Sequence, residues 1–414
     1  MARPLGRPAA RRSPGYPPWP GRQRSGADRH FERTRPMGRT LARRTRLFSG
    51  SAAAMTSLIP LRSPAPSAPG LSASDRAAAL ERLLAASGWD KAGRRLLAGD
   101  ASFRRYDRLT RDSGATAVLM DAPPPLEDVR PFLGIARHLT NLGFSAPEVL
   151  AADETAGFVL LEDLGEGTYT RLLGQGHDET ALYALAIDVL AELHTKTRAR
   201  GLPADLPAYD DARMLAEPLL FAQWTVPALL GQALDGATLE AFRCHLAEVL
   251  PVARGVDQTL VLRDFHVDNL LLLPGRTGQA RCGLLDFQDA VAGPLTYDLM
   301  SLLEDARRDI DPTLMTAMTG RYLDHFPGLD REAFAASWAV LAALRHLKVI
   351  GIFTRLAHRD GKPGYLVHIP RLWRLLERSL AHPALAPLAR WLDHAVPKDA
   401  RRVPDPHPLS RPLA

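Results

Sequence analysis

Apolar positions between residues 72 and 164 alternate with polar ones, which predicts a small sheet. The alternating aromatic and leucine positions of SFRRYDRLT, the turn RDSGAT and the apolar run AVLM together predict an antiparallel hairpin. The segments PEVLAAD and GFVLLEDL predict two more strands. Helical spacing interrupts this pattern twice, and we expect helices at about 75–87 and 126–142.

From residue 165 onward the apolar positions return every three or four residues, as on the buried face of a helix. The segment ETALYALAIDVLAELHTKT, residues 179–197, is strongly apolar. Further helical patterns occur at 236–250, 295–307, 312–323, 331–358 and 369–380. The chain is therefore expected to be α+β, with a small antiparallel N-terminal lobe and a larger, mostly helical C-terminal lobe.

Four strongly polar side chains separate two apolar runs in VLRDFHVDNLLLL, residues 261–273. Asp264 and Asn269 fall in a short loop after the strand TLVLR, and the strand LLLL turns through PGRTG into ARCGLLD, which ends at Asp286. Because a hairpin returns the chain to its starting point, Asp286 is expected beside Asn269. The pattern predicts that three polar side chains converge on one spot.

An Asp and an Asn five residues apart, joined by a hairpin to a second Asp, suit phosphoryl transfer. One carboxylate orients an acceptor hydroxyl and accepts its proton, while the amide oxygen and the second carboxylate are hard ligands for Mg²⁺ on the phosphates of ATP. The alternative is a zinc site of Asp264, His266, Asp268 and Asp286, which lacks the usual His and Cys set.

Two motifs resemble those of the aminoglycoside phosphotransferase family, a small-molecule branch of the protein-kinase-like fold. DFHVDN, residues 264–269, is similar to the family's D-x-H-x-x-N catalytic loop, and LLDFQDAVAGPLTYDL, residues 284–299, is similar to its metal-binding element. The resemblance covers residues 75–380 and implies a bilobal kinase-like fold that uses ATP and Mg²⁺. The roles it implies are a catalytic base for Asp264, a phosphate contact for His266, metal ligands for Asn269 and Asp286, and a structural aspartate for Asp298.

The same resemblance implies lobe boundaries. The N-lobe, with the nucleotide loop and sheet, is expected at residues 72–164, and the C-lobe, with the catalytic loop, metal site and acceptor pocket, at 165–395. A flexible tail is expected at 396–414.

Five segments are similar to those of the anomeric sugar kinases within this family: GDASFRRY, LMDAPP, LLEDLG, LRDFHVDN and LKVIGIFTRLAHRDGKPGYL. That subgroup phosphorylates N-acetylmuramate and N-acetylglucosamine at C1 during peptidoglycan recycling. The resemblance implies an ATP-dependent kinase whose partner is a small amino sugar. An aminoglycoside or choline kinase is the first alternative, and a catalytically inactive module that binds a nucleotide or sugar is the second.

The nucleotide site follows from the same resemblance. The turn over the phosphates would run from Gly99 to Phe103, with Ser102 and Phe103 as contacts, although an ordinary hairpin turn also suits this sequence. Glu162 and Leu164 would belong to the hinge whose backbone binds adenine, and a strand end with exposed acids is the alternative.

The chain departs from the kinase pattern at the strand lysine. Met120 and Asp121 stand where most kinases place the lysine that binds the α and β phosphates. The nearest replacements are Arg104 and Arg105 on the preceding strand, and strand alternation directs only one of them at the cleft. The alternative for either arginine is a surface charge without a role in phosphate binding. The missing lysine is consistent with the hypothesis of an inactive binding module, whereas the retained catalytic-loop and metal residues favour an enzyme.

Charge predicts the acceptor pocket. Four basic residues of the helix expected through residues 338–359 lie within about 80° of one another, namely Arg345, Lys348, Arg355 and Arg359. Such a cationic stripe repels cationic antibiotics and favours a neutral acceptor or one with a lactyl carboxylate, with a solvated helix face as the alternative. Glu217 is expected to bond sugar hydroxyls and Trp224 to stack on the ring, unless the Trp only packs an amphipathic helix.

Positive charge is concentrated at the start of the chain. The first fifty residues hold thirteen arginines against two acidic residues, a local charge of +11, so the rest of a chain with net charge +6 carries −5. Residues 1–70 are rich in Arg, Pro, Gly, Ser and Ala, which predicts a disordered basic extension. A transit peptide, an anion-binding arm and a dispensable tail upstream of a start at Met55 are its possible roles. The body of the chain gives no signal for nucleic acid.

Cysteine content and apolar run length indicate the compartment. Cys244 and Cys282 form neither a disulfide framework nor a metal-ligand pattern, which favours a reduced intracellular protein. No uninterrupted apolar run approaches the roughly 20 residues that cross a bilayer. We therefore expect a cytoplasmic protein without a membrane partner. We also expect a monomer without a nucleic-acid partner.

Overall fold

The computed structural model describes residues 71–99 and 103–406, and all of these belong to one compact unit. Three of the sequence predictions lie outside the described residues: the basic extension at 1–70, Ser102 of the nucleotide loop, and the end of the tail at 407–414.

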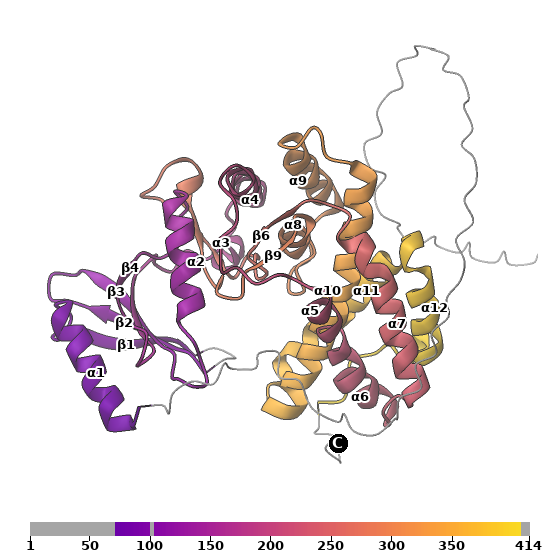
Figure 1. Ribbon diagram of the computed structural model, residues 1–414, viewed down its shortest axis with the longest axis horizontal. Coiled ribbons are helices and arrows are strands. Elements are labelled where there is room, and N and C mark those ends of the chain that lie inside the picture. The colour runs from indigo at the N-terminus through magenta and orange to yellow at the C-terminus, as the bar shows by residue number, and fades with distance from the viewer. Residues whose placement is uncertain (1–70, 100–102, 407–414) are drawn as a thin grey trace, which may run out of the picture. The chain divides into compact units, whose positions relative to one another are not determined.

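An antiparallel sheet of five strands, in the order β1-β2-β3-β5-β4, forms the N-terminal part (Figure 1). Its strands are β1 (Gly93–Gly99), β2 (Arg105–Thr110), β3 (Thr116–Asp121), β4 (Val149–Asp153) and β5 (Phe158–Glu162). The predicted hairpin is β2–β3, and the predicted helices are α1 (Ala73–Ala86) and α2 (Arg130–Asn141). Two details differ from the prediction, since β1 is a separate strand and α2 begins at Arg130 rather than near residue 126.

The helix α1 covers one face of this sheet. Its amphipathic side packs on inward-facing residues of β2, β3 and β5, and the cluster contains Ala79, Trp89, Leu109, Ala117, Leu119, Ala156, Phe158 and Leu160. The Ser72 hydroxyl accepts a hydrogen bond from the Asp75 amide at 3.1 Å and so caps the helix. Figure 1 shows α2 on the side of the sheet away from α1. There the Phe132 ring stacks on Phe287 with centroids 5.0 Å apart, which connects α2 to the polar loop described below.

Helices make up most of the C-terminal part. They are α3 (Tyr169–Gly174), α4 (Glu179–Arg200), α5 (Asp211–Ala216), the π-helix η1 (Phe221–Thr225), α6 (Val226–Leu230), α7 (Gly236–Ala253), α8 (Thr296–Leu303), α9 (Pro312–Asp324), α10 (Arg331–Asp360), the 3-10 helix η3 (Pro363–His368), α11 (Ile369–Leu380) and α12 (Ala386–Ala395). The long helical patterns in the sequence correspond to α4 and α7 to α11, and the expectation of an α+β chain with a helical second lobe is confirmed.

The 30-residue helix α10 runs through the core of this helical part. It packs against η1, α7, α8 and α11. By length and composition α10 is the one helix of the described residues that could cross a membrane. The sequence does not show it as an uninterrupted apolar run, because charged residues interrupt its apolar positions. Of its most apolar 18-residue window, 78% is buried inside the fold, as in the core helix of a globular domain.

Two small antiparallel sheets frame the polar loop of the helical part. β6 (Gln258–Val261) pairs with β9 (Val291–Pro294), and β7 (Leu270–Leu272) pairs with β8 (Cys282–Leu284). The register sets Leu270 opposite Leu284, so the residue before β7 lies beside the residues after β8. The predicted β7–β8 hairpin is confirmed, whereas the sequence does not predict β9.

The segment after α12 is packed, at variance with the flexible tail expected from residue 396. Val396 is fully buried, and the Arg401 side chain, 3% exposed, pairs with Glu377 and Asp393. The Trp373 indole donates to the Arg402 carbonyl oxygen at 3.4 Å. The polar composition of this segment suggests a tail, but its arginines find carboxylate and carbonyl partners on the helices.

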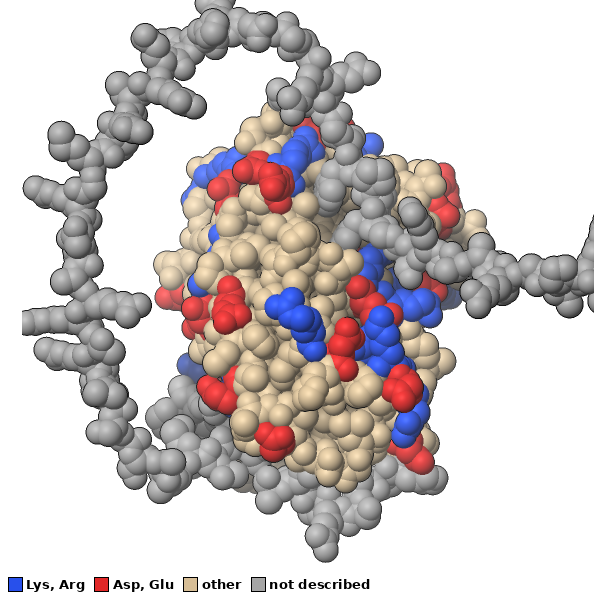
Figure 2. Space-filling view, turned by 90° about the vertical axis from the view of Figure 1, so that its right-hand side faces the viewer, with Lys and Arg blue, Asp and Glu red and all other residues tan. Residues whose placement is uncertain are grey.

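Acidic and basic side chains are mixed on the surface. Figure 2 shows one face on which both signs are interspersed among uncharged residues, without a continuous field of either sign.

Candidate active site

A buried carboxylate holds the loop that follows β6. Asp298 of α8 accepts hydrogen bonds from the backbone amides of Leu262 at 2.6 Å and Arg263 at 2.9 Å. Arg263 has φ of 72°, a left-handed conformation that a non-glycine residue adopts where its surroundings enforce it. Burial raises the pKa of Asp298 to about 7. Asp298 therefore ties the loop to α8, which fixes the direction in which the next residue, Asp264, leaves the strand.

Asp264 is ionised by its cationic neighbours. Its side chain is 37% exposed, and the Arg345 guanidinium lies 3.8 Å from its carboxylate. The surrounding protein acts to raise the pKa of Asp264, but the charges of Arg345 and Lys348 outweigh this effect and lower the pKa below its ordinary value. At neutral pH the carboxylate is therefore charged and free to accept a proton.

Asn269 lies between Asp264 and Asp286. Its amide nitrogen donates to the Asp264 carbonyl oxygen at 2.9 Å and lies 3.4 Å from an Asp286 carboxylate oxygen. Asp286 has φ of 56°, and its other carboxylate oxygen accepts from Gln288 at 2.7 Å. The side-chain oxygen of Asn269 makes no hydrogen bond to a described residue. The hairpin thus brings Asp264, Asn269 and Asp286 together, with the Asn269 amide group next to the Asp286 carboxylate.

His266 and Asp268 belong to the same loop, where His266 is buried and Asp268 is partly exposed. The His266 ring is 6% exposed, with Nε2 at 3.4 Å from the Asn269 amide nitrogen and Nδ1 buried without a partner. Burial lowers the pKa of His266, so the ring is neutral. The Asp268 carboxylate accepts from the Thr170 hydroxyl and lies 3.3 Å from Arg307. His266 therefore supports Asn269 from behind, and Asp268 braces the loop against α3.

The zinc alternative receives no support from the geometry. Among the residues that the structure describes, no group of three or more His, Cys, Asp or Glu side chains is arranged to hold a metal ion. A Mg²⁺ ion bound on nucleotide phosphates needs only one or two protein oxygens, which Asn269 and Asp286 offer.

The two arginines that precede the strand lysine position differ in burial. Arg104 is 8% exposed and pairs through Nε with the Glu127 carboxylate at 3.1 Å. Burial lowers the pKa of Arg104, but Tyr106, Glu127 and Asp286 outweigh it and the pKa is raised, so Arg104 and Asp286 interact. Arg105 is exposed and lies 3.2 Å from Asp107. Only Arg104 points inward, as strand alternation requires, and it is not a surface charge.

Phe103 and the hinge complete the predicted nucleotide site. Phe103 is exposed, and its amide donates to Glu127 at 3.2 Å. At the hinge, the Glu162 amide donates to the Glu148 carbonyl oxygen at 2.8 Å, and its side chain pairs with Arg276. The Leu164 amide makes no hydrogen bond to a described residue. The adenine contact of Leu164 stays a prediction.

Glu217 does not point into an open pocket, which corrects the role expected for it. Its side chain is 4% exposed and contacts Lys348 at 3.1 Å, the Tyr209 hydroxyl at 2.7 Å and Arg263. Burial acts to raise the pKa of Glu217, but the charges of Lys348 and Arg263 outweigh it and lower the pKa to about 2. Glu217 is thus a buried counter-ion beneath the loop rather than a group that faces sugar hydroxyls.

Arg345 and Lys348 also face inward. The Arg345 guanidinium, 11% exposed, donates to the Tyr297 hydroxyl at 3.0 Å and to the Arg263 carbonyl oxygen at 3.2 Å. Lys348 is 12% exposed beside Glu217. Both belong to one charge network with Asp264, whereas Trp224 is half-buried in η1.

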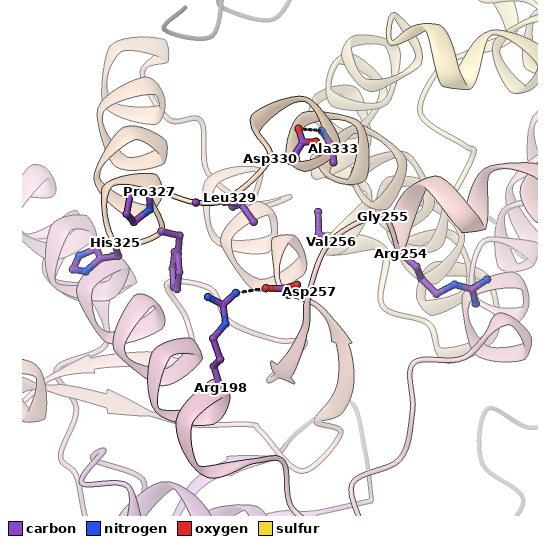
Figure 3. A pocket seen from close by; sticks show the side chains of 12 residues that line it. Arg198, Arg254, Gly255, Val256, Asp257, His325, Pro327, Leu329, Asp330 and Ala333 are labelled. Carbon is purple, nitrogen blue, oxygen red and sulfur yellow. Dashed lines mark hydrogen bonds and ion pairs between the residues drawn. The ribbon is translucent and has the colours of Figure 1, made fainter. Parts of the chain in front are cut away.

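A cavity of about 840 Å³ lies away from this site, before the start of β6 (Figure 3). Arg198, Asp257 and Phe326 are among the residues that line it, and Arg198 is paired with Asp257. None of the predicted site residues lines this cavity.

Comparison with known proteins identifies the family. The model of the phosphotransferase enzyme family matches residues 93–335, which is more than half of the chain. The chain belongs to this phosphotransferase family. Its enzyme class is therefore that of a phosphotransferase with a hydroxyl group as acceptor.

Curated relatives of this phosphotransferase carry one name. An N-acetylmuramate/N-acetylglucosamine kinase of Caulobacter vibrioides is 39% identical over 361 residues, which cover 80% of this chain and 99% of the relative. A protein with the same name from Pseudomonas aeruginosa is 38% identical, with 76% of this chain and 92% of the relative covered.

Solved structures agree on the fold of the phosphotransferase. An ethanolamine kinase of Plasmodium vivax matches with a TM-score of 0.50 and 12% identity over 74% of this chain and 87% of that one. The GDP complex of aminoglycoside 2'-phosphotransferase-IIIa matches with a TM-score of 0.50 and 14% identity over 73% and 98% of the two chains. The predicted kinase-like fold is thereby confirmed.

Some site residues of the phosphotransferase escaped sequence analysis. Glu127 lies in a turn before α2, and Tyr209 lies in an irregular segment, so neither stands in a regular pattern. Arg263 stands directly before Asp264, and its backbone conformation leaves no trace in the sequence. The sequence does contain one indirect signal for Glu127. The missing strand lysine calls for another cation in the cleft, and a buried cation such as Arg104 needs a carboxylate partner.

Proposed function

We propose that this phosphotransferase transfers the γ-phosphate of ATP to the anomeric hydroxyl of N-acetylmuramate and N-acetylglucosamine, with Mg²⁺, in peptidoglycan recycling. The observation that carries the proposal is the convergence of Asp264, Asn269 and Asp286 in a chain 39% identical to a kinase named for these sugars. The cationic surroundings of Asp264 favour a neutral or anionic acceptor over an aminoglycoside or choline.

Asp264 acts as the base in this proposal. The sugar C1 hydroxyl donates its proton to the Asp264 carboxylate while its oxygen forms a bond to the γ-phosphorus and the bond to the ADP oxygen breaks. The products are a sugar 1-phosphate and ADP. Arg345 and Lys348 keep Asp264 ionised and ready to accept the proton, which supports the assignment. They act as positioning residues that contact the carboxylate network rather than the sugar itself.

Asn269 and Asp286 would hold the metal ion. The amide oxygen of Asn269 and the Asp286 carboxylate, which lies 3.4 Å from the Asn269 amide nitrogen, are the kind of hard oxygen donors that Mg²⁺ prefers. When bound, Mg²⁺ would neutralise phosphate charge during the transfer. His266 contributes by holding Asn269 from behind, and any contact from its neutral ring to the transferred phosphate would need the ring to turn out of its buried position.

The nucleotide would lie between the hinge and the first strands. The free amide of Leu164 is suited to hydrogen-bond adenine, while Glu162 contributes its carbonyl oxygen, because its amide already bonds Glu148. Arg104 would bind the α and β phosphates in place of the strand lysine, with Glu127 as its counter-ion and the Phe103 amide nearby. Arg105 faces solvent and is left without a role in the cleft.

The division into lobes at 72–164 and 165–395, action in the cytoplasm and a monomeric state are part of the same proposal. The end of β5 at Glu162 is consistent with the proposed lobe boundary. Light scattering of the purified protein tests the monomer.

Turnover on a panel of acceptors tests the proposal. We expect phosphorylation of N-acetylmuramate and N-acetylglucosamine with ATP and Mg²⁺, and none of kanamycin or choline. Asp264→Asn should lower kcat by roughly 10²- to 10⁴-fold and leave nucleotide binding intact, because only proton acceptance is lost. Asp289→Asn, an exposed residue near Asp286, is the matched control.

Three results would contradict the proposal. Turnover of kanamycin or choline alone would favour the first alternative. Nucleotide binding without turnover of any acceptor would favour the inactive module. Full turnover by Asp264→Asn would remove the proposed base.

A further inference from the structure

One cation of the stripe on α10, Arg355, has no carboxylate of a described residue within ion-pair distance, although the charge of Asp360 acts on it from further away. Arg345 faces Asp264, Lys348 contacts Glu217, and Arg359 pairs with the neighbouring Asp360 at 2.7 Å. Arg355 makes no ion pair or hydrogen bond with any described residue, and its Nε is buried without a partner. Buried polar groups without partners are rare in folded proteins and indicate a missing partner.

The segment from Glu217 to Thr225 runs alongside this stripe in the same direction. Glu217 meets Lys348, and the Gly351 backbone lies so close to Leu220 that an added Cβ would be 2.4 Å from the Leu220 carbonyl carbon. One turn further, the hydroxyls of Thr225 and Thr354 are 3.1 Å apart.

These contacts set Trp224 at the level of Arg355. Trp224 comes one residue before Thr225, and Arg355 comes one residue after Thr354. Both side chains are half-buried, so each keeps a part of its surface free for a ligand. An aromatic ring and an unpaired guanidinium at one level are the groups that bind a sugar ring with a carboxylate substituent.

The distance along α10 suits an acceptor held at Asp264. At 1.5 Å per residue, Arg355 lies about 10 Å beyond Lys348 and about 15 Å beyond Arg345 along the axis. Helical side chains slope toward the N-terminus, so the Arg355 guanidinium leans back toward Lys348 and Asp264. A sugar whose C1 hydroxyl is at Asp264 would therefore extend its substituents toward Arg355.

We propose that Arg355 binds the lactyl carboxylate of N-acetylmuramate, with Trp224 against the sugar ring, and thereby determines the preference for N-acetylmuramate over N-acetylglucosamine. This inference rests on the proposed function. The other cations of the stripe are already neutralised by carboxylates of the protein, so they have less to offer an anionic substituent. Burial and the nearby Arg359 lower the pKa of Arg355 and outweigh the opposite effect of Asp360, and a bound carboxylate would relieve that cost.

The first experiment compares kcat/KM for the two sugars in Arg355→Gln and wild type. Loss of a charge-assisted hydrogen bond is expected to lower kcat/KM for N-acetylmuramate by roughly 10- to 100-fold. The ratio of N-acetylmuramate to N-acetylglucosamine turnover should fall by the same factor, since N-acetylglucosamine has no carboxylate. Arg359→Gln, one turn along and paired with Asp360, is the control and should leave the ratio unchanged.

The second experiment removes the charge from the acceptor instead of from the protein and compares wild type with Arg355→Gln. Wild type should lose a similar factor on the methyl ester of N-acetylmuramate, and Arg355→Gln should not distinguish the ester from the acid. If Arg355→Gln leaves the ratio of kcat/KM for the two sugars unchanged, the inference is overturned while the proposed function stands. Turnover of neither sugar by wild type would overturn both.

Discussion

Arg104 is a residue whose burial makes a role in phosphate binding testable. It is 8% exposed beside Glu127, and it interacts with Asp286, so its charge faces the proposed nucleotide site. We expect Arg104→Gln to raise KM for ATP by roughly tenfold or more, because a charged contact to phosphate is lost. Arg105→Gln, the exposed neighbour, should leave KM for ATP unchanged. Steady-state kinetics at varied ATP concentration measure both.

A second variant separates binding from folding. Arg104→Gln leaves the Glu127 carboxylate buried without its partner, which by itself destabilises a protein. The double variant Arg104→Gln/Glu127→Gln should recover thermal stability without recovering the affinity for ATP. Recovery of both would mean that Arg104 serves the fold alone.

Arg345 offers a test of the base through the pH dependence of kcat. Its charge holds the pKa of Asp264 below the ordinary value of an aspartate, so the wild-type acid limb should lie below that value. Arg345→Gln removes the largest of the charges that lower the pKa of Asp264, so this pKa should rise toward its ordinary value. The acid limb of kcat should consequently move to higher pH, while Arg345→Lys should keep it near the wild-type position. An acid limb that stays in place in Arg345→Gln would argue against Asp264 as the base.

Residue patterns predict which groups meet but not which of them are neutralised. The spacing of Asp264 and Asn269 and the hairpin to Asp286 were sufficient to predict their convergence. Glu217 was assigned to an open pocket, because its sequence neighbourhood does not reveal that Arg263 and Lys348 surround it. A carboxylate with a role toward ligand and a buried counter-ion have the same letter in the sequence, and only the tertiary partners distinguish them.

At the scale of elements, strong periodicity was predictable and short strands were not. The helices predicted from long apolar patterns are present in the structure with boundaries shifted by at most a few residues, namely α4, α7, α9, α10 and α11. The four-residue strand β9 has the sequence VAGP, and its pairing with β6 comes from the chain returning after the polar loop. The η1 segment was likewise beyond prediction, since its π-helical turn depends on the close approach of α10 at Gly351.

The variant Gly351→Ala tests whether the close approach of α10 to η1 shapes the acceptor pocket. A Cβ at this position would lie 2.4 Å from the Leu220 carbonyl carbon and 2.6 Å from the Phe221 nitrogen, so η1 would have to move. We expect Gly351→Ala to lower thermal stability and to raise KM for the sugar more than KM for ATP, because Trp224 moves with η1. Steady-state kinetics and thermal unfolding measure these effects.

Gly320 in α9 is the matched control. A Cβ there would meet nothing within 4 Å, and alanine favours a helix over glycine by about 1 kcal/mol. Gly320→Ala should therefore be neutral or slightly stabilising, with both KM values unchanged. Equal changes of both KM values in Gly351→Ala would indicate a general loss of packing rather than an effect on the acceptor pocket.

At the scale of the whole molecule, the site depends on contacts that cross between the sheet and the helices. Phe132 of α2 stacks on Phe287, the residue after Asp286, so the position of α2 is coupled to the proposed metal ligand. Arg108 of β2 pairs with Asp163 at 2.7 Å next to the hinge. Global stability and the geometry of the site are therefore linked, and conditions that weaken the fold should weaken both.

Acid conditions should weaken the fold through buried neutral histidines. His194 of α4 is 4% exposed and lies 2.7 Å from the Tyr322 hydroxyl of α9. Burial, together with the charge of Arg198, lowers the pKa of His194 to about 3, whereas in the unfolded chain it is about 6.5. Below pH 6.5 the unfolded chain binds a proton at this residue and the folded chain does not. The free energy of unfolding therefore loses about 1.4 kcal/mol per pH unit from His194 as the pH falls toward 4.

A comparison of two variants isolates this effect, because Asp298 acts in the opposite direction. The raised pKa of Asp298, about 7, means that the folded chain takes up its proton first as the pH falls, which adds stability between pH 7 and 4. His194→Gln keeps a group that can bond Tyr322 but cannot titrate, so denaturant unfolding from pH 6 to 4 should show a slope shallower than wild type by about 1.4 kcal/mol per pH unit. His177→Gln, at an exposed position, is the control substitution. If His194→Gln and wild type show the same slope, His194 is protonated in the folded chain and the packing of α4 on α9 is looser than its burial implies.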